Sequence, residues 1–196
     1  MLWLYQTSTG TREQAGSIEQ VLFQRSLRSS LVSVPDVRKS VVVDADPQRC
    51  FQVFTQQPST WWPPRHLLLD NPRVGLIMEP RVGGRYYEWD AEGNERQWGT
   101  VVSWAPGALI RFTWRVGENW RPLDGDASAS EIEVTFTPAD GGTTVELAHV
   151  ELDRLGEFAP SMRAALDGPS PGETLGLFVL AIDKMRASQI LDQHDE

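Results

Sequence analysis

The polar side chain with the clearest potential for chemistry is His149, near the end of an alternating run of residues. Val145, Leu147 and His149 share one face of a strand predicted over residues 143–150, because side chains alternate across a strand. An imidazole on an inward face could bind a ligand oxygen or move a proton near neutral pH. The alternative is a core histidine satisfied by a backbone group, or one at the strand end near water.

The run from Arg85 to Trp89 offers a second set of polar and aromatic groups. Tyr87 and Trp89 share a face with Arg85, while Tyr86 and Glu88 share the other. A phenol, a guanidinium or a carboxylate in a cavity could orient a ligand. The alternation alone leaves open which face points inward.

Aromatic residues recur along the strands that follow. Trp98 lies in a strand over 97–104, and Phe112 and Trp114 share a face of a strand over 109–116. Rings on a curved antiparallel sheet can line a pocket, although simple core packing explains them equally well. Upstream, the short turn at Trp61 and Trp62 is expected to bury only one of its two rings.

Other kinds of catalytic centre have little support in this chain. The three histidines, at 66, 149 and 194, lack ligand spacing, so neither a metal nor another cofactor is expected. Gly83 and Gly84 precede a strand without a nearby Lys-Ser/Thr, unlike a phosphate loop. Cys50 is the only cysteine, which excludes an intrachain disulfide and agrees with a reducing cytosol.

Composition limits the partners. The chain has 196 residues, with 40% hydrophobic and 23% charged residues and a formal net charge of −9. This acidic balance disfavours nucleic acid and anionic membrane surfaces. No apolar run approaches the roughly 18 residues of a membrane helix. The sequence therefore predicts a cytoplasmic domain of ordinary globular composition.

The predicted elements place these residues. Residues 1–36 are polar and are expected to form a flexible extension, followed by a domain over 37–191 and a frayed acidic tail over 192–196. A strand over 37–43 leads to a helix that starts at Asp46-Pro47, where aspartate can cap and proline suits the first turn. A short helical turn and about six strands follow.

A long helix should close the domain. Ser170-Pro171-Gly172-Glu173 has the pattern of a capped helix start. An apolar stripe at helical spacing, which includes Phe178 and Ile182, should lie against the sheet. The expected fold is α+β, with a cavity between a curved antiparallel sheet and this helix. The residues expected to line it are Tyr87, Trp89, Trp98, Phe112, Trp114, His149, Phe178 and Ile182.

A series of short motifs across residues 35–188 resembles a known family. The motifs are Phe51-Gln-Val-Phe-Thr55, Trp61-Trp62-Pro63 with His66, Glu79-Pro-Arg-Val-Gly-Gly84, Trp98-Gly99, Phe112-Thr-Trp114, Val134-Thr-Phe-Thr-Pro138 and Gly142-Thr-Thr-Val-Glu-Leu147 with His149. In order and spacing they resemble the bacterial homologues of the activator of the heat-shock protein 90 ATPase, in the START/Bet v 1-like (SRPBCC) superfamily. The resemblance implies a helix-grip fold. It does not assign a reaction, because one scaffold hosts many functions.

Three functional hypotheses follow. The leading one is binding of a small hydrophobic or aromatic molecule in this cavity, and the sequence does not decide whether turnover follows. The second is a cyclase- or hydrolase-like enzyme, in which His149 with Tyr87 or Glu88 performs acid–base work. The third, implied by the resemblance, is a module that docks to a chaperone ATPase. A homodimer is a further possible assembly.

Overall fold

The computed structural model describes residues 33–168 and 173–192. The expected extension over residues 1–36 therefore lies mostly outside the described residues, as do part of the helix start at 170–173 and most of the tail. The elements, in chain order, are β1 (Val37–Val43), α2 (Pro47–Gln56), η1 (Pro58–Thr60), β2 (Arg73–Met78), β3 (Arg85–Asp90), β4 (Glu95–Ala105), β5 (Leu109–Trp114), η2 (Glu118–Trp120), β6 (Ser130–Ala139), β7 (Gly142–Val150), η3 (Leu152–Phe158), α3 (Ala159–Asp167) and α4 (Glu173–Asp192).

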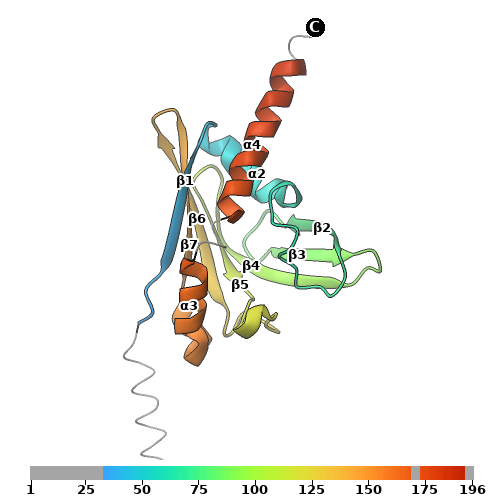
Figure 1. Ribbon diagram of the computed structural model, residues 1–196, viewed down its shortest axis with the longest axis vertical. Coiled ribbons are helices and arrows are strands. Elements are labelled where there is room, and N and C mark those ends of the chain that lie inside the picture. Colours follow the sequence, from blue (N-terminus) through green and yellow to red (C-terminus); the bar gives the residue numbers. More distant parts are fainter. Residues whose placement is uncertain (1–32, 169–172, 193–196) are drawn as a thin grey trace, which may run out of the picture. The chain divides into compact units, whose positions relative to one another are not determined.

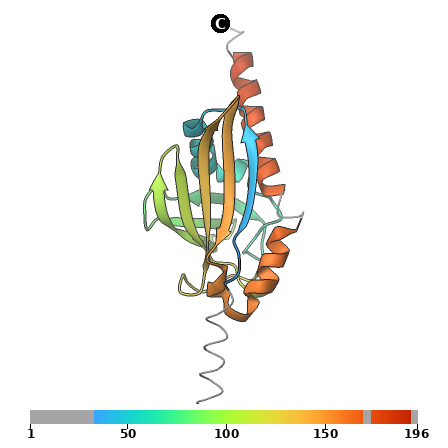
Figure 2. The ribbon, with the colours of Figure 1, turned by 90° about the vertical axis from the view of Figure 1, so that its left-hand side faces the viewer.

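The strands form one antiparallel sheet of seven strands, in the order β1-β7-β6-β5-β4-β3-β2. Neighbours in the chain are neighbours in the sheet except for β1, which pairs with β7. Strands β2, β3 and β4 cross the direction of β1, β6 and β7, so the sheet is strongly curved (Figures 1 and 2). Helices α2 and α4 lie inside this curve (Figure 1). The predicted α+β helix-grip architecture is confirmed.

Helix α2 forms as the sequence predicts. The Asp46 carboxylate accepts a hydrogen bond from the Arg49 amide at 2.9 Å, and Pro47 occupies the first turn. Phe51 and Phe54 are buried, and each packs edge-on against Phe136 of β6, with ring centroids 5.6 and 5.8 Å apart. These contacts attach the helix to the sheet and form the centre of the core.

Helix α4 packs through its first half. Leu175, Phe178 and Ile182 are buried, and the ring of Phe178 lies against Phe54 and Trp61. Side chains at 183–188 are exposed, apart from the half-buried Met185. The apolar stripe expected to cover the sheet therefore acts mainly at the start of the helix. Between residues 183 and 188 the helix leaves most of its side chains exposed to solvent.

The turn after α2 differs from the expectation that only one of its tryptophans is buried. Both Trp61 and Trp62 are buried. The Trp61 indole donates to the Val53 carbonyl of α2 and packs on Phe178, whereas Trp62 packs on Trp98 of β4. The turn lies between helix and sheet, so both of its sides are covered.

Candidate functional site

A cavity of about 480 Å³ opens on the inner side of the sheet. This volume lies within the usual range for small-molecule sites, roughly 300–1,000 Å³. The lining comes from the segment after η1, from five strands or their ends, and from η2, α3 and α4. The lining residues are Lys39, Trp62, Arg65, His66, Leu67, Leu68, Trp98, Trp114, Val116, Trp120, Ile132, Leu147, His149, Ala165, Leu166, Thr174 and Leu175.

Three tryptophans make a continuous aromatic wall. The rings of Trp98 and Trp114 stack with centroids 5.0 Å apart and an interplanar angle of 26°. Trp62 packs against both, at 5.1 Å from Trp98 and 5.8 Å from Trp114. All three are buried. Such a wall suits a flat aromatic ligand, because offset and edge-on ring contacts are favourable beyond the burial of area.

A β-bulge brings Trp98 to this wall. In the pairing of β3 with β4, Tyr86 faces Gly99 and Tyr87 faces Gln97, so Trp98 is the extra residue. A Cβ atom on Gly99 would lie 1.7 Å from the Thr113 carbonyl oxygen, so only glycine fits. Bulges bend a strand and redirect its side chains. Here the bulge helps both to curve the sheet and to bury the Trp98 ring.

His149 lines the cavity beside the aromatic wall. Its ring is 6.0 Å from that of Trp114, and the residue is only 8% exposed. Burial, and then the positive charge of Lys39, lower the pKa of His149 to about 4. The imidazole is therefore neutral at physiological pH. Its Nδ1 atom has no hydrogen-bond partner among the described residues, so His149 keeps a ring nitrogen for another molecule.

The aromatic wall also contains unpaired donors. The indole Nε1 atoms of Trp62, Trp98 and Trp114 are buried, and none of them meets an acceptor within the described part of the chain. Buried polar groups are normally paired, so each such group calls for an explanation. An acceptor on a bound molecule is one such explanation.

Two segments complete the cavity wall, and different charged groups hold them. The segment 62–69 is tied to the buried Glu88 carboxylate, which accepts hydrogen bonds from the amides of Leu68 at 2.6 Å and Leu69 at 3.1 Å. Arg73 pairs with Glu88 at 3.1 Å and donates to the carbonyl of His66 at 3.0 Å. Glu88, on the inner face of β3, thus anchors segment 62–69, and its carboxylate points away from solvent.

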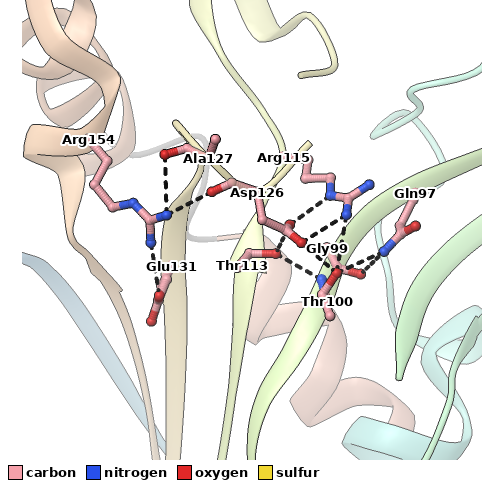
Figure 3. Close-up of polar contacts among 9 residues, drawn as sticks. All are labelled: Gln97, Gly99, Thr100, Thr113, Arg115, Asp126, Ala127, Glu131 and Arg154. Atoms are coloured by element: carbon pink, nitrogen blue, oxygen red, sulfur yellow. Dashed lines mark hydrogen bonds and ion pairs between the residues drawn. The ribbon is translucent and has the colours of Figure 1, made fainter. Parts of the chain in front are cut away.

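The loop that carries Trp120 is held by a network outside the cavity (Figure 3). Asp126 receives two hydrogen bonds from Arg115, at 2.7 and 2.9 Å, and others from the hydroxyls of Thr113 and Thr100. The bonds from Arg115 are the main reason that the pKa of Asp126 is well below its usual value. Arg154 donates to the Asp126 carbonyl at 2.7 Å and to the Glu131 carboxylate at 3.1 Å.

Trp120 itself is 50% exposed and lines the cavity. Its φ is 60°, and that of Asn119 is 54°, so both are in the left-handed region. This conformation is costly for a bulky side chain, and residues held in it cluster at functional sites. Trp120 is therefore a large apolar side chain kept at the edge of the cavity against its backbone preference.

The structure distributes the expected lining residues over three places. Trp98, Trp114 and His149 line the cavity together. Phe112, Phe178 and Ile182 are buried in the core, outside the lining. Tyr87 and Trp89 lie on the opposite face of β3, because Tyr86 and Glu88 take the inner face. There the Arg85 guanidinium stacks 3.9 Å over the Tyr87 ring, and Trp89 packs over Gly75.

Several lining residues were not expected from the sequence. Lys39 had a readable signal, since it alternates with Val37, Val41 and Val43 and must share their inward face. His66 and Trp120 had none, because both lie in irregular segments whose course depends on distant anchors. Among the described residues, no three His, Cys, Asp or Glu side chains are grouped as metal ligands.

The family model for activator of Hsp90 ATPase homolog 1-like proteins matches residues 44–167. The chain belongs to this family. It has Bet v 1-like (SRPBCC) structural relatives, as the motifs suggested. No curated protein matches the sequence. Within the two described stretches, no helix is both long and apolar enough to cross a membrane.

The solved structures include a relative of high identity. An anthrahydroquino-gamma-pyrone synthase, Txn09, solved in a complex, is 53% identical over 76% of this chain and 97% of its own, with a TM-score of 0.54. A protein from Nitrosomonas europaea is 15% identical over 76% of this chain and 95% of its own, with a TM-score of 0.55. One from Rhodobacter sphaeroides is 20% identical over 80% and 95%, with a TM-score of 0.55. The latter two support the fold alone.

Proposed function

We propose that the protein binds a fused-ring aromatic compound in its cavity and closes an oxygen-containing ring on it. The observation that carries the proposal is the stacked Trp98–Trp114 pair beside the neutral, unpaired imidazole of His149. The 53% identity to a protein named anthrahydroquino-gamma-pyrone synthase supports the same reaction class. This goes beyond the ligand binding that the sequence favoured.

The cavity suits the ligand in size and shape. About 480 Å³ accommodates several fused rings. The Trp98–Trp114 pair offers aromatic contact at one part of the lining, and the exposed Trp120 ring stands at another. A planar, rigid ligand loses little conformational freedom on binding, so most of the contact energy is kept.

The chemistry of ring closure needs a base and a site for developing negative charge. An aryl hydroxyl loses its proton as its oxygen bonds to the far carbon of an alkyne conjugated with a ketone. One carbon–carbon π bond of the alkyne opens, and its electrons make the ketone oxygen negative. His149 is neutral near pH 7 and can take the proton. Lys39 lines the cavity as a donor that could stabilise the oxyanion, and three tryptophans of the lining carry unpaired N–H groups. Once the carbon is reprotonated, the reaction is an isomerisation.

The test uses a hydroxylated anthrahydroquinone that carries a neighbouring alkynyl ketone, kept reduced and free of oxygen. Closure to the γ-pyrone leaves its mass unchanged, so chromatography with absorbance detection follows the reaction. We expect the protein to accelerate closure, and His149→Gln to lower kcat by about 10²–10⁴-fold, the usual contribution of general acid–base catalysis. The same variant should keep its affinity, measured by quenching of tryptophan fluorescence.

A control is Cys50→Ser, which changes a buried core side chain outside the cavity lining. This variant should retain full turnover. If the wild-type protein binds the compound without accelerating closure, the enzymatic proposal is wrong and the protein is a carrier. If His149→Gln retains full turnover, the base lies elsewhere.

A further inference from the structure

The charge of the cavity lining is opposite to that of the whole protein. The chain has a formal net charge of −9. Yet the lining contains the cations Lys39 and Arg65, and none of its described side chains is Asp or Glu. The chain has 27 Asp and Glu residues against 18 Lys and Arg residues, so a lining of average composition would contain more carboxylates than cations. A lining with cations and no carboxylates therefore indicates that Lys39 and Arg65 have a role in the site.

The side chain of Lys39 is held at the cavity. It lies on β1 between Val37 and Val41, on the inner face, and is half-buried. Its ammonium donates to the carbonyl of Gly168 at 2.6 Å, which fixes the side chain across the gap between β1 and the end of α3. A carbonyl satisfies one of its three donors without neutralising its charge. The positive charge thus remains available to a ligand.

The other polar groups of the lining have the same bias. The indoles of Trp62, Trp98 and Trp114 can only donate, and their N–H groups are unpaired among the described residues. The charge of Lys39 contributes to the low pKa of His149, so the two groups share one electrostatic environment. A ligand with acceptors and negative charge would satisfy these groups, while an ammonium would meet only repulsion.

We propose that the ligand is an anionic, acceptor-rich aromatic molecule, held with its negative group near Lys39 and Arg65. This inference rests on the proposed function for the aromatic part and adds the charge. For a hydroxylated anthrahydroquinone, the negative group is an ionised hydroxyl other than the one whose proton His149 takes. Lys39 is then a specificity-determining residue, which selects ligands that carry this second, ionised group.

The experiment compares three probes with one ring system and different charge: anthraquinone sulfonate, hydroxymethyl anthraquinone and aminomethyl anthraquinone. Binding is followed by quenching of tryptophan fluorescence at low salt near neutral pH. We expect the sulfonate to bind about tenfold more tightly than the neutral probe, and the ammonium more weakly still. The advantage of the sulfonate should shrink as salt is added, because the Debye length falls from about 10 Å at 0.1 M to about 3 Å at 1 M.

Lys39→Gln should weaken sulfonate binding about five- to tenfold and leave the neutral probe within about twofold, a selective effect expected for a charge at the site. Arg65→Gln, at an exposed position, gives a second test if Lys39→Gln folds poorly. Arg96→Gln removes the same charge from an exposed strand position outside the lining and should change neither affinity.

The outcomes separate the two proposals. Equal affinity for all three probes, or an effect of Lys39→Gln and Arg65→Gln as large on the neutral probe as on the sulfonate, overturns the charge assignment and leaves the proposed function standing. Binding of none of the three aromatic probes overturns the aromatic-ligand proposal itself, and the charge assignment with it.

Discussion

The two segments that complete the cavity wall are built in opposite ways. Segment 62–69 is anchored from inside, by a Glu88 side chain that is 0% exposed and by Arg73. The loop 117–129 is anchored from outside, by Asp126, whose side chain is 36% exposed. The first carries the buried Trp62, and the second carries the half-exposed Trp120. One part of the wall therefore belongs to the core, whereas the other can change with little cost to the fold.

This difference follows from how accessible each carboxylate is to water. A buried carboxylate that loses its partners cannot turn to water, so its contacts are strongly coupled to folding. A carboxylate near the surface exchanges protein donors for water when the loop opens, which limits the cost. Accordingly, we expect ligand entry to involve the 117–129 loop.

The largest effect should come from Glu88→Ala. The change leaves the Leu68 and Leu69 amides and Arg73 without their buried acceptor. We expect a loss of about 3–5 kcal/mol in the free energy of unfolding, the usual cost of breaking a buried pair. Urea denaturation followed by fluorescence measures it. Glu95→Ala, which breaks an exposed pair with Arg85, should cost less than about 1 kcal/mol; similar losses for both variants would contradict the comparison.

The second effect is a loss of stability in acid that originates at His149, which lines the same cavity as both segments. The pKa of His149 falls from 6.5 to about 4 on folding. Between these values the unfolded chain binds a proton that the folded chain does not, so stability declines as pH falls through this window. Above pH 6.5 there is no penalty. The full loss at pH 4 would approach about 3 kcal/mol, and His149→Gln should remove this part of the pH profile.

A smaller effect is expected from Asp126→Asn. The variant weakens the bonds from Arg115, Thr113 and Thr100, and we expect a loss of about 1–2 kcal/mol, because solvent already screens the site. The pKa of Asp126 is lowered on folding, so its contribution is present above its unfolded pKa of 3.8 and lost as pH falls below it. Hydrogen exchange should show faster opening of the 117–129 loop and unchanged protection at 62–69. Equal loss of protection in both segments would show that they are not independent.

The smallest effect on stability should come from Trp120→Ala. Its ring is half exposed and its backbone is strained, so the free energy of unfolding should change by less than about 0.5 kcal/mol. Affinity for an aromatic ligand should nevertheless fall about tenfold, the loss of one ring contact of roughly 1.4 kcal/mol. Tyr87→Ala, which removes a ring from the outer face of β3, should leave affinity unchanged. A fall in affinity with Tyr87→Ala alone would place the ligand on the other face of the sheet.

Much of the fold could be predicted from the sequence, because the patterns that predict helices and strands involve only neighbouring residues. The Asp46-Pro47 helix start and the alternation of Val145, Leu147 and His149 both follow from backbone geometry over a few residues. Both appear in the structure as expected. The same rule would have placed Lys39 on the inner face of β1. The motif series also identified the family, which the family model shows.

The residues of the candidate site were harder to predict from the sequence, because contacts between residues distant in the chain bring them together. Alternation could not decide between Tyr87 and Tyr86 as the inward ring of β3, since both faces are aromatic. The buried pair of Glu88 and Arg73 sets that choice. Likewise, the bulge at Gly99 depends on the close Thr113 carbonyl of the next strand.

By itself, the sequence determined which segments form strands and helices, because those preferences act over neighbouring residues. It also determined which strands carry aromatic rings and that His149 lies on an inward strand face. Only the tertiary structure decided that Trp62, Trp98, Trp114 and His149 border one cavity with Lys39. The reason is physical: the position of a cavity depends on strand curvature and on buried charges that pair across the sheet, and no local pattern contains those distances.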